Sequence, residues 1–316
     1  MKEFAYRRAT DLRDALLAGS TGARYLGGGT NLVDLMKHGV ETPDRLIDVR
    51  RLPLAGIRET ADGGLLIGAT TTNSDLAAHP EVRRRYPALS QAVLAGASGQ
   101  LRNMATVAGN LLQRTRCAYF ADLSQPCNKR LPGSGCPAIT GVHHNHAILG
   151  WSPQCAATHP SDMAVALVAF DAIVRYETID GTGEIPLEEF YGDTPQRETV
   201  LPPGALITAV VLPGSAVSPR SRYRKIRERA SYAFATVSIA AGLDGDSPRI
   251  ALGGVAPRPW RARTAESRLV DGPFTTDGFR AVAEAELSAA ESLPGNAYKV
   301  TLARNLIVAV LEEVCA

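Results

Sequence analysis

The spacing of apolar residues divides the chain into regions that predict different structures. Within residues 1–56, a short strand at 24–26 runs into three glycines. Apolar residues then recur at helical spacing as far as Gly39, and a second strand follows at 46–49. This region therefore predicts a short βαβ-like unit.

Residues 57–113 begin with a hairpin, because the sequence Asp-Gly-Gly at 62–64 is a strong turn former. Its second strand, 65–67, leads to a helix that begins near Asn73, and another helix is predicted at 87–94.

Regular patterns return after residue 160. They predict an apolar helix at 162–170, strands at 172–178 and 205–212, and a linker rich in Pro, Gly and Ser at 213–219. Beyond the linker, two strands are predicted before three helices, at 233–241, 249–255, 260–270, 276–291 and 296–313. Strands followed by helices indicate a separate α+β domain.

Residues 114–160 are the least regular part of the chain, with too little apolar periodicity to be ordered by packing. A loop of this length needs something else to order it. It holds four of the five cysteines, with nine, eight and eighteen residues between successive ones: Cys117, Cys127, Cys136 and Cys155.

Structural zinc sites usually contain closely spaced cysteine pairs, and this segment has none. Iron–sulfur clusters tolerate wider spacing, and a proline follows Cys136, as it follows the last cysteine of bacterial ferredoxins. The spacing favours a cluster. Zinc, disulfides and cysteines without any shared site stay open as alternatives. Four cations would offset the charge of a thiolate cluster: Arg114, Arg116, Lys129 and Arg130.

Other polar features have ordinary interpretations. His143, His144 and His146 could bind a metal, but histidines are common on solvated loops, and we favour that interpretation. Cys315 has no obvious partner. The basic run at 220–229 is either a solvated face or a strand with one face on a ligand or partner.

Composition narrows the class of protein. The 316 residues are 45% hydrophobic and 21% charged, which indicates a globular chain of two, or at most three small, domains. The net charge of +2 argues against a nucleic-acid binder. No apolar run reaches the length of a membrane-spanning helix, and the first residues lack the apolar core of a signal peptide.

The glycines at 27–29 lie between a strand and a helix, where backbone N–H groups can approach a phosphate. A tight turn without a ligand is the alternative. The sequence is not a Rossmann fingerprint, because Leu32 takes the position of the last glycine, and no P-loop occurs. Two similar corners, at 68–71 and 105–110, suggest that three corners converge on one extended ligand that carries a pyrophosphate.

These corners resemble a known family. The sequences GGGTNL at 27–32, IGATT at 67–71 and RNMATVAGNL at 102–111 are similar to the FAD-binding medium subunits of molybdenum hydroxylases, such as the xanthine and CO dehydrogenases. The similarity extends over essentially the whole chain.

The resemblance implies an α+β fold with two parts. The first, 1–216, is a PCMH-type (vanillyl-alcohol-oxidase-like) FAD-binding domain, with α/β subdomains at about 1–56 and 57–216 and an insertion at about 114–160. The second, 220–316, is a C-terminal domain like that of the CO dehydrogenase flavoprotein.

The insertion resembles the iron–sulfur-flavin subunit of periplasmic aldehyde oxidoreductases, in which a [4Fe-4S] cluster lies beside FAD. 4-Hydroxybenzoyl-CoA reductase has a comparable insertion, but the sequence ASYAFA at 230–235 favours the aldehyde enzyme. The resemblance implies four cluster ligands, Cys117, Cys127, Cys136 and Cys155.

The same resemblance implies the FAD site. The pyrophosphate is expected against Leu26, Gly27, Gly28, Gly29, Thr30, Asn31, Leu32, Val33 and Asp34, and a second phosphate or ribityl contact against Thr106, Gly109 and Asn110. Asp162 is expected to accept hydrogen bonds from flavin hydroxyls; otherwise it is an acid in the first turn of a helix. Lys225 is expected near the isoalloxazine, where its charge would stabilise reduced flavin; otherwise it is a surface lysine.

Together these implications describe an electron-transfer subunit of a molybdenum-dependent aldehyde oxidoreductase, with no catalytic side chain of its own. A large subunit with the molybdenum cofactor and a small subunit with [2Fe-2S] clusters complete a heterotrimer, and FAD passes electrons to an external acceptor. No nucleic acid and no membrane insertion are expected. The complex is expected in the periplasm, exported with a signal-bearing partner, or alternatively in the cytoplasm.

Three other functions stay open on the sequence. The chain could be the flavin subunit of another xanthine dehydrogenase-family enzyme, such as a 4-hydroxybenzoyl-CoA reductase. A stand-alone flavin oxidase would need a substrate-covering domain, for which 220–316 is small. The third alternative is a zinc-ordered binding module.

Overall fold

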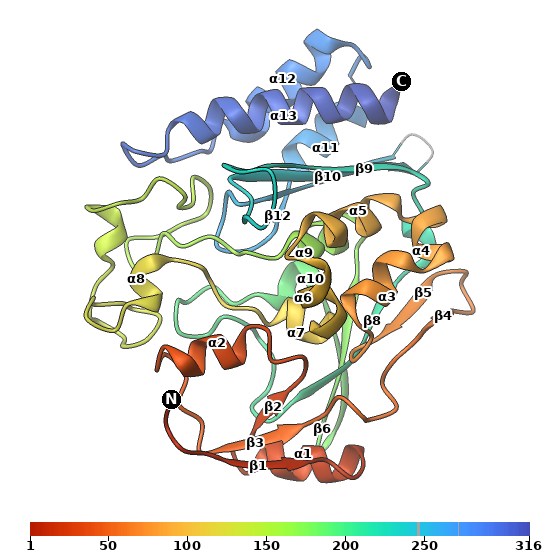
Figure 1. Ribbon diagram of the computed structural model, residues 1–316. Coiled ribbons are helices and arrows are strands. Elements are labelled where there is room, and N and C mark those ends of the chain that lie inside the picture. The colour runs from red at the N-terminus through yellow and green to blue at the C-terminus, as the bar shows by residue number, and fades with distance from the viewer. Residues whose placement is uncertain (245–246, 271) are drawn as a thin grey trace.

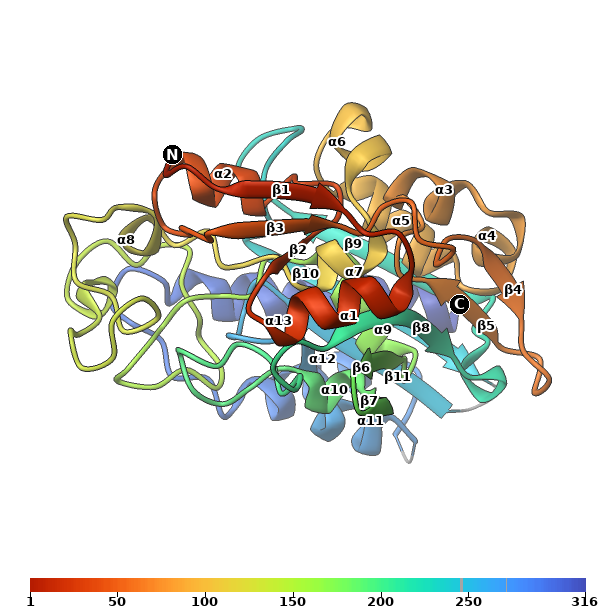
Figure 2. The same ribbon diagram turned by 90° about the horizontal axis from the view of Figure 1, so that it is seen from below.

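The computed structural model describes residues 1–244, 247–270 and 272–316, which form three sheets with helices between and around them (Figure 1). The first sheet is parallel, with the order β1-β3-β2. Its strands are β1 (Ala5–Arg8), β2 (Arg24–Leu26) and β3 (Arg45–Asp48). The helices α1 (Leu12–Ser20) and α2 (Leu32–Lys37) connect these strands. Figure 2 shows this sheet with α1 from below.

The predicted strand–helix–strand unit of the N-terminal region is confirmed. The strand β1 was not predicted, because all four of its residues are exposed and it has no buried apolar positions. Asp11 caps α1 by accepting a hydrogen bond from the Asp14 backbone N–H, and Leu16 packs with Ile47 in a small core.

The second sheet is antiparallel, with the order β4-β5-β8-β6-β7. Its strands are β4 (Ile57–Glu59), β5 (Leu65–Gly68), β6 (Ile173–Thr178), β7 (Gly181–Pro186) and β8 (Leu206–Leu212). The helices of this region are α3 (Asn73–Ala78), α4 (Pro80–Arg85), α5 (Pro87–Ala95), α6 (Gly99–Met104), α7 (Val107–Leu111), α9 (Asp162–Ala169) and α10 (Leu187–Phe190), and a 3₁₀ turn, η2 (Gly214–Ala216), follows β8. Every residue of α9 is buried, which explains why its sequence is apolar on all sides.

The third sheet is antiparallel and has both faces covered. Its strands are β9 (Arg220–Ile226), β10 (Val237–Asp244), β11 (Ser247–Gly253) and β12 (Trp260–Arg261), in the order β12-β11-β10-β9. On one face lie α11 (Arg263–Val270), α12 (Thr276–Leu287) and α13 (Tyr298–Cys315) (Figure 1). On the other face, Tyr223, Ala240 and Ala251 join the core that contains α5 and α9.

Four predicted boundaries in this region are wrong by more than two residues. The strand expected at 233–241 spans Val237–Asp244, and the helix expected to reach 291 ends at Leu287. The helix expected from residue 260 begins at Arg263, because Trp260 and Arg261 form the strand β12. The alanines at 233 and 235 line a cavity instead of continuing the strand. The alternation of apolar residues that suggested a strand there therefore belongs to the wall of the cavity.

The cysteine-containing segment, 114–160, extends to one side of the molecule (Figures 1 and 2) and is irregular, as predicted. Its only regular elements are α8 (Ala118–Ala121) and the 3₁₀ turn η1 (Pro137–Ile139). The expectation that packing does not order it is wrong for its second half. Ile148 and Leu149 are fully buried in the C-terminal core, and both backbone N–H groups donate to the Val255 carbonyl, at 2.8 and 3.0 Å.

Within the described residues, none of the helices combines the length and the apolar character that crossing a membrane requires.

Candidate functional site

The glycine loop between β2 and α2 packs directly against the loop between α6 and α7. A Cβ atom on Gly28 would lie 1.8 Å from the carbonyl oxygen of Met104, so only glycine fits there. Gly29 has a φ of +74°, in the left-handed region that glycine adopts without strain. The glycines are thus needed for the approach of two backbones, whether or not a phosphate binds.

The third corner, after β5, is joined to the same place by backbone hydrogen bonds. The Val107 N–H donates to the Thr71 carbonyl at 3.0 Å, and the Asn73 N–H donates to the Ala105 carbonyl at 2.9 Å. The three corners that the sequence singled out therefore lie together. The expectation that each joins a strand to a helix is wrong for the corner at 105–110, which joins α6 to α7.

Two cavities flank the glycine loop, one of about 1060 Å³ and one of about 900 Å³. Thr30, Asn31 and Gly109 line both, so the loop lies where they meet. The larger cavity also includes Asp34, Asn110, Asp162 and Lys225, and the smaller one Gly27, Gly28, Gly29, Leu32 and Thr106. Of the expected FAD contacts, only Leu26 and Val33 line neither cavity.

The polar groups at this junction suit an elongated anionic ligand. The side-chain oxygen of Asn31 accepts from the Arg114 backbone N–H at 2.9 Å, which leaves the buried Nδ2 with no hydrogen-bond partner among the described residues. Buried donors are normally paired, so a free one indicates a missing acceptor. The paired cavities and the side-chain-free loop between them fit a dinucleotide such as FAD.

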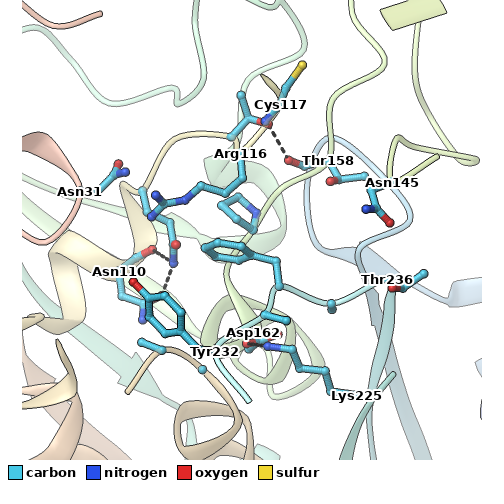
Figure 3. Close-up of a pocket in the computed structure, with 18 of the residues that line it drawn as sticks. Asn31, Asn110, Arg116, Cys117, Asn145, Thr158, Asp162, Lys225, Tyr232 and Thr236 are labelled. Carbon is cyan, nitrogen blue, oxygen red and sulfur yellow. Dashed lines mark hydrogen bonds and ion pairs between the residues drawn. The ribbon is translucent and has the colours of Figure 1, made fainter. Parts of the chain in front are cut away.

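Asp162 and Lys225 bind each other at the wall of the larger cavity (Figure 3). Lys225 Nζ lies 2.7 Å from Asp162 Oδ2, and the side chains are 3% and 8% exposed. Tyr223 donates its hydroxyl to Asp162 Oδ1 at 2.5 Å, and burial, followed by the Asp162 charge, raises the Tyr223 pKa well above its usual value. Lys225 is not a surface lysine, because its side chain is buried. Asp162 is an acid in the first turn of α9, but it also forms an ion pair.

The helix α9, which carries Asp162, is fixed at both ends. Ser161 caps its N-terminus and donates its hydroxyl to Asn110 Oδ1 at 2.6 Å. At the C-terminus, Arg261 donates to the carbonyls of Val168 and Ala169 at 2.6 and 2.8 Å. The position of the Asp162 carboxylate therefore depends on both the glycine-loop region and the C-terminal domain.

Three of the four cations expected to offset cluster charge have other partners. Arg114 pairs with Glu41 and Glu198 at 2.6 and 2.7 Å, and Lys129 pairs with Glu198 at 2.7 Å. Arg130 donates to backbone carbonyls of the segment itself.

Arg116 differs from these three, because it faces the larger cavity (Figure 3). Its guanidinium lies 4.8 Å from the centre of the Phe234 ring, and Tyr232 lines the same cavity. Sequence reasoning did not assign these aromatic residues to the site. The signal was present in the two rings at 232 and 234, which interrupt a run of small residues that otherwise resembles a strand.

The four clustered cysteines are all half-buried. The neighbouring Cys155 lowers the pKa of Cys136, and Cys136, followed by burial, raises the pKa of Cys155. Burial raises the pKa of Cys117, and the nearby Cys127 and Cys136 add to that effect. The Sγ atom of Cys117 lies 3.2 Å from His146 Nε2.

Across the described residues, no three His, Cys, Asp or Glu side chains converge on the position of a single metal ion. A cubane cluster presents a separate iron to each thiolate, so its ligands need not converge in that way. Four half-buried thiols in one segment are chemically suited to such a cluster.

Comparison with known proteins gives matches over nearly the whole chain. Residues 2–215 match the family "FAD binding domain in molybdopterin dehydrogenase", and residues 221–314 match the "CO dehydrogenase flavoprotein C-terminal domain". The aldehyde oxidoreductase FAD-binding subunit PaoB of Escherichia coli is 52% identical over 99% of this chain and 98% of its own length.

More distant relatives agree. The carbon monoxide dehydrogenase medium chain of Hydrogenophaga pseudoflava is 27% identical, over 99% of this chain and 97% of its own. A solved structure of carbon monoxide dehydrogenase from that organism superimposes with a TM-score of 0.76 at 26% identity, covering 99% of this chain and 97% of that one. The expected fold class is confirmed by these matches.

Proposed function

The chain belongs to the FAD-binding medium-subunit family of the molybdenum hydroxylases, and we propose that it is the FAD- and [4Fe-4S]-containing electron-transfer subunit of a molybdenum-dependent aldehyde oxidoreductase. The observation that carries this proposal is the 52% identity, over nearly the full length of both chains, to an aldehyde oxidoreductase FAD-binding subunit. Family membership makes the chain an oxidoreductase subunit; the aldehyde substrate and the cluster are the proposed parts.

When bound, FAD supplies the chemistry of accepting and passing on electrons. The residues of this chain bind and orient it. The backbone of Gly27, Gly28 and Gly29 would face the pyrophosphate without obstruction, and the free Nδ2 of Asn31 would donate to a phosphate oxygen. The Asp162 carboxylate, fixed by Lys225 and Tyr223, would accept from hydroxyl groups of the ligand.

Partners and location complete the proposal. A large subunit would hold the molybdenum cofactor, and a small subunit would hold [2Fe-2S] clusters that deliver electrons to the FAD of this chain, in a heterotrimer. Medium chains of multi-subunit enzymes among the relatives support this arrangement. We place the complex in the periplasm, reached by export with a signal-bearing partner; fractionation of cells distinguishes this from a cytoplasmic location.

The test is cofactor analysis of the anaerobically purified complex and of single cysteine variants. The wild type should contain FAD, iron and sulfide, with roughly four irons for this chain beyond those of the partner's clusters. Changing Cys117, Cys127, Cys136 or Cys155 to serine should remove that iron and increase proteolysis within 114–141. Cys315→Ser is the matched control and should change neither.

Two results would contradict the cluster. One is zinc in place of iron in the wild-type chain, and the other is full iron retention in Cys155→Ser. FAD content is a separate readout: a chain without flavin would contradict the FAD site itself, whatever the iron content.

A further inference from the structure

We propose that His146 is a positioning residue that donates an N–H hydrogen bond to the sulfur of Cys117 and thereby sets the reduction potential of the cluster next to the flavin cavity. This inference rests on the proposed [4Fe-4S] site. It assigns a role to one member of the histidine tract that sequence reasoning had interpreted as part of a solvated loop.

The geometry begins with the contact between the two side chains. His146 Nε2 lies 3.2 Å from Cys117 Sγ, and His146 as a whole residue is only 9% exposed. A thiolate bound to iron can accept a hydrogen bond but cannot donate one, so the hydrogen must be on Nε2. Nδ1 is then an acceptor, and it is buried with no hydrogen-bond partner in the described part of the chain.

The backbone of His146 is held by the C-terminal domain. Its carbonyl accepts from Lys299 Nζ at 2.8 Å and from Asn296 Nδ2 at 3.2 Å. Both of these side chains are completely buried, at the start of α13 and just before it. A buried ammonium and a buried amide that both bind one carbonyl leave little freedom for the residue that carries it.

The other two histidines of the tract separate into different roles. His143 is also buried: its Nδ1 lies 3.0 Å from the Ala138 carbonyl, and its Nε2 accepts from the Gly295 N–H at 2.8 Å. These bonds join His143 to the Ala138 and Gly295 backbones, and none of the hydrogen bonds among the described residues joins it to a cysteine. His144 is exposed and contacts Glu228 and Tyr298, but it also lines the larger cavity. His38, which is exposed and lines neither cavity, is therefore the matched control.

His146 also borders the larger cavity, as does Cys117. The imidazole therefore lies between a cluster ligand and the space assigned to FAD. Hydrogen bonds to the sulfur ligands of iron–sulfur clusters are among the main determinants of their potential, because they stabilise the more electron-rich, reduced form. Removing the donor should lower the potential of the cluster and change its driving force relative to FAD.

The experiment is a redox titration of the assembled complex, followed by electron paramagnetic resonance. In His146→Phe, which keeps a ring but has no donor, the cluster potential should fall while iron and FAD contents stay at wild-type levels. His146→Gln, which retains an N–H donor, should recover part of the shift. His38→Gln should match the wild type. A cluster potential in His146→Phe equal to that of the wild type would overturn the assignment.

A second measurement, on the wild-type protein, applies if His146→Phe loses its cluster. In protein labelled with ¹⁵N-histidine, pulsed electron paramagnetic resonance of the reduced cluster should show hyperfine coupling to a histidine nitrogen. This coupling should be absent from His146→Gln. No histidine coupling in the wild type would equally overturn the inference. Absence of iron from the wild type would instead contradict the proposed function, so the two failures are distinguishable.

Discussion

At the scale of single residues, the glycine loop is determined by backbone contact. Because a Cβ on Gly28 would lie 1.8 Å from the Met104 carbonyl, Gly28→Ala must displace one of the two loops. We expect a loss of about 1–3 kcal/mol in the free energy of unfolding of the flavin-free chain, with reduced FAD content. Denaturant unfolding and flavin absorbance measure the two effects.

Gly99→Ala is the control for this prediction. A Cβ at Gly99 meets no atom within 4 Å, and its backbone is not left-handed, so FAD content should be unchanged and the stability of the flavin-free chain should be equal or slightly higher. If glycine were needed at position 28 only to leave room for a phosphate, Gly28→Ala would lose FAD but keep the stability of the flavin-free chain.

Residue types and local spacing were sufficient to select the glycine corner, whereas Asp162 and Lys225 were expected only from the family resemblance. The glycines, Asn31, Asp162 and Lys225 line the two cavities, but their pairings were not predicted. The sequence could not show that Asp162 and Lys225 bind each other, because the contact joins residues 63 positions apart. For the same reason, the histidine–cysteine contact across 29 positions was not foreseen.

At the scale of elements, the Asp162–Lys225 pair connects the start of α9 to the strand β9. Lys225→Met would leave the Asp162 carboxylate buried without its cation, and Asp162→Asn would leave the ammonium without its anion. Breaking a buried pair in this way typically costs about 3–5 kcal/mol. Thermal or denaturant unfolding of the flavin-free chain should show this loss in each single variant.

The double variant Asp162→Asn/Lys225→Met tests whether charge is the cause. It should recover part of the stability lost by either single variant, because no unpaired charge remains. Losses that simply add would mean that the pair contributes by packing alone.

Lys225→Met should also lower the reduction potential of the flavin, because it leaves a net negative charge beside the cavity, and the double variant should reverse that shift.

Elements with strong local patterns were predictable, and those shaped by distant contacts were not. The buried helix α9 was predicted to within one residue, because its apolar sequence has clear ends. The hairpin strand β7 was missed, since its sequence GTGEIP has little apolar alternation and is placed by pairing with β6. Residues 233–236 were predicted as strand because they alternate, but they form part of the cavity wall.

At the scale of the whole molecule, a buried lysine joins the cysteine segment to the C-terminal domain. Lys299 has no exposed surface, and its ammonium donates to the carbonyls of His146 and Gly254. Domain packing of this kind could not be predicted, because the position of Lys299 in its helix gives no indication of what lies opposite. The consequence is a titratable group at the junction of the cysteine-containing segment and the C-terminal domain.

Burial lowers the pKa of Lys299 to about 7, whereas a lysine in the unfolded chain titrates near about 10.4. Between these values the unfolded state binds more protons than the folded state, so this residue makes stability rise with pH; below pH 7 its effect is constant. We expect a slope of about 1.4 kcal/mol per pH unit between about pH 7.5 and 9.5 that Lys299→Met lacks. The measurement is the difference in unfolding free energy between wild type and Lys299→Met across that range, in which titrations common to both chains cancel. Parallel curves for the two proteins would show that Lys299 keeps its proton when buried, with the carbonyl oxygens of the segment compensating for the loss of water.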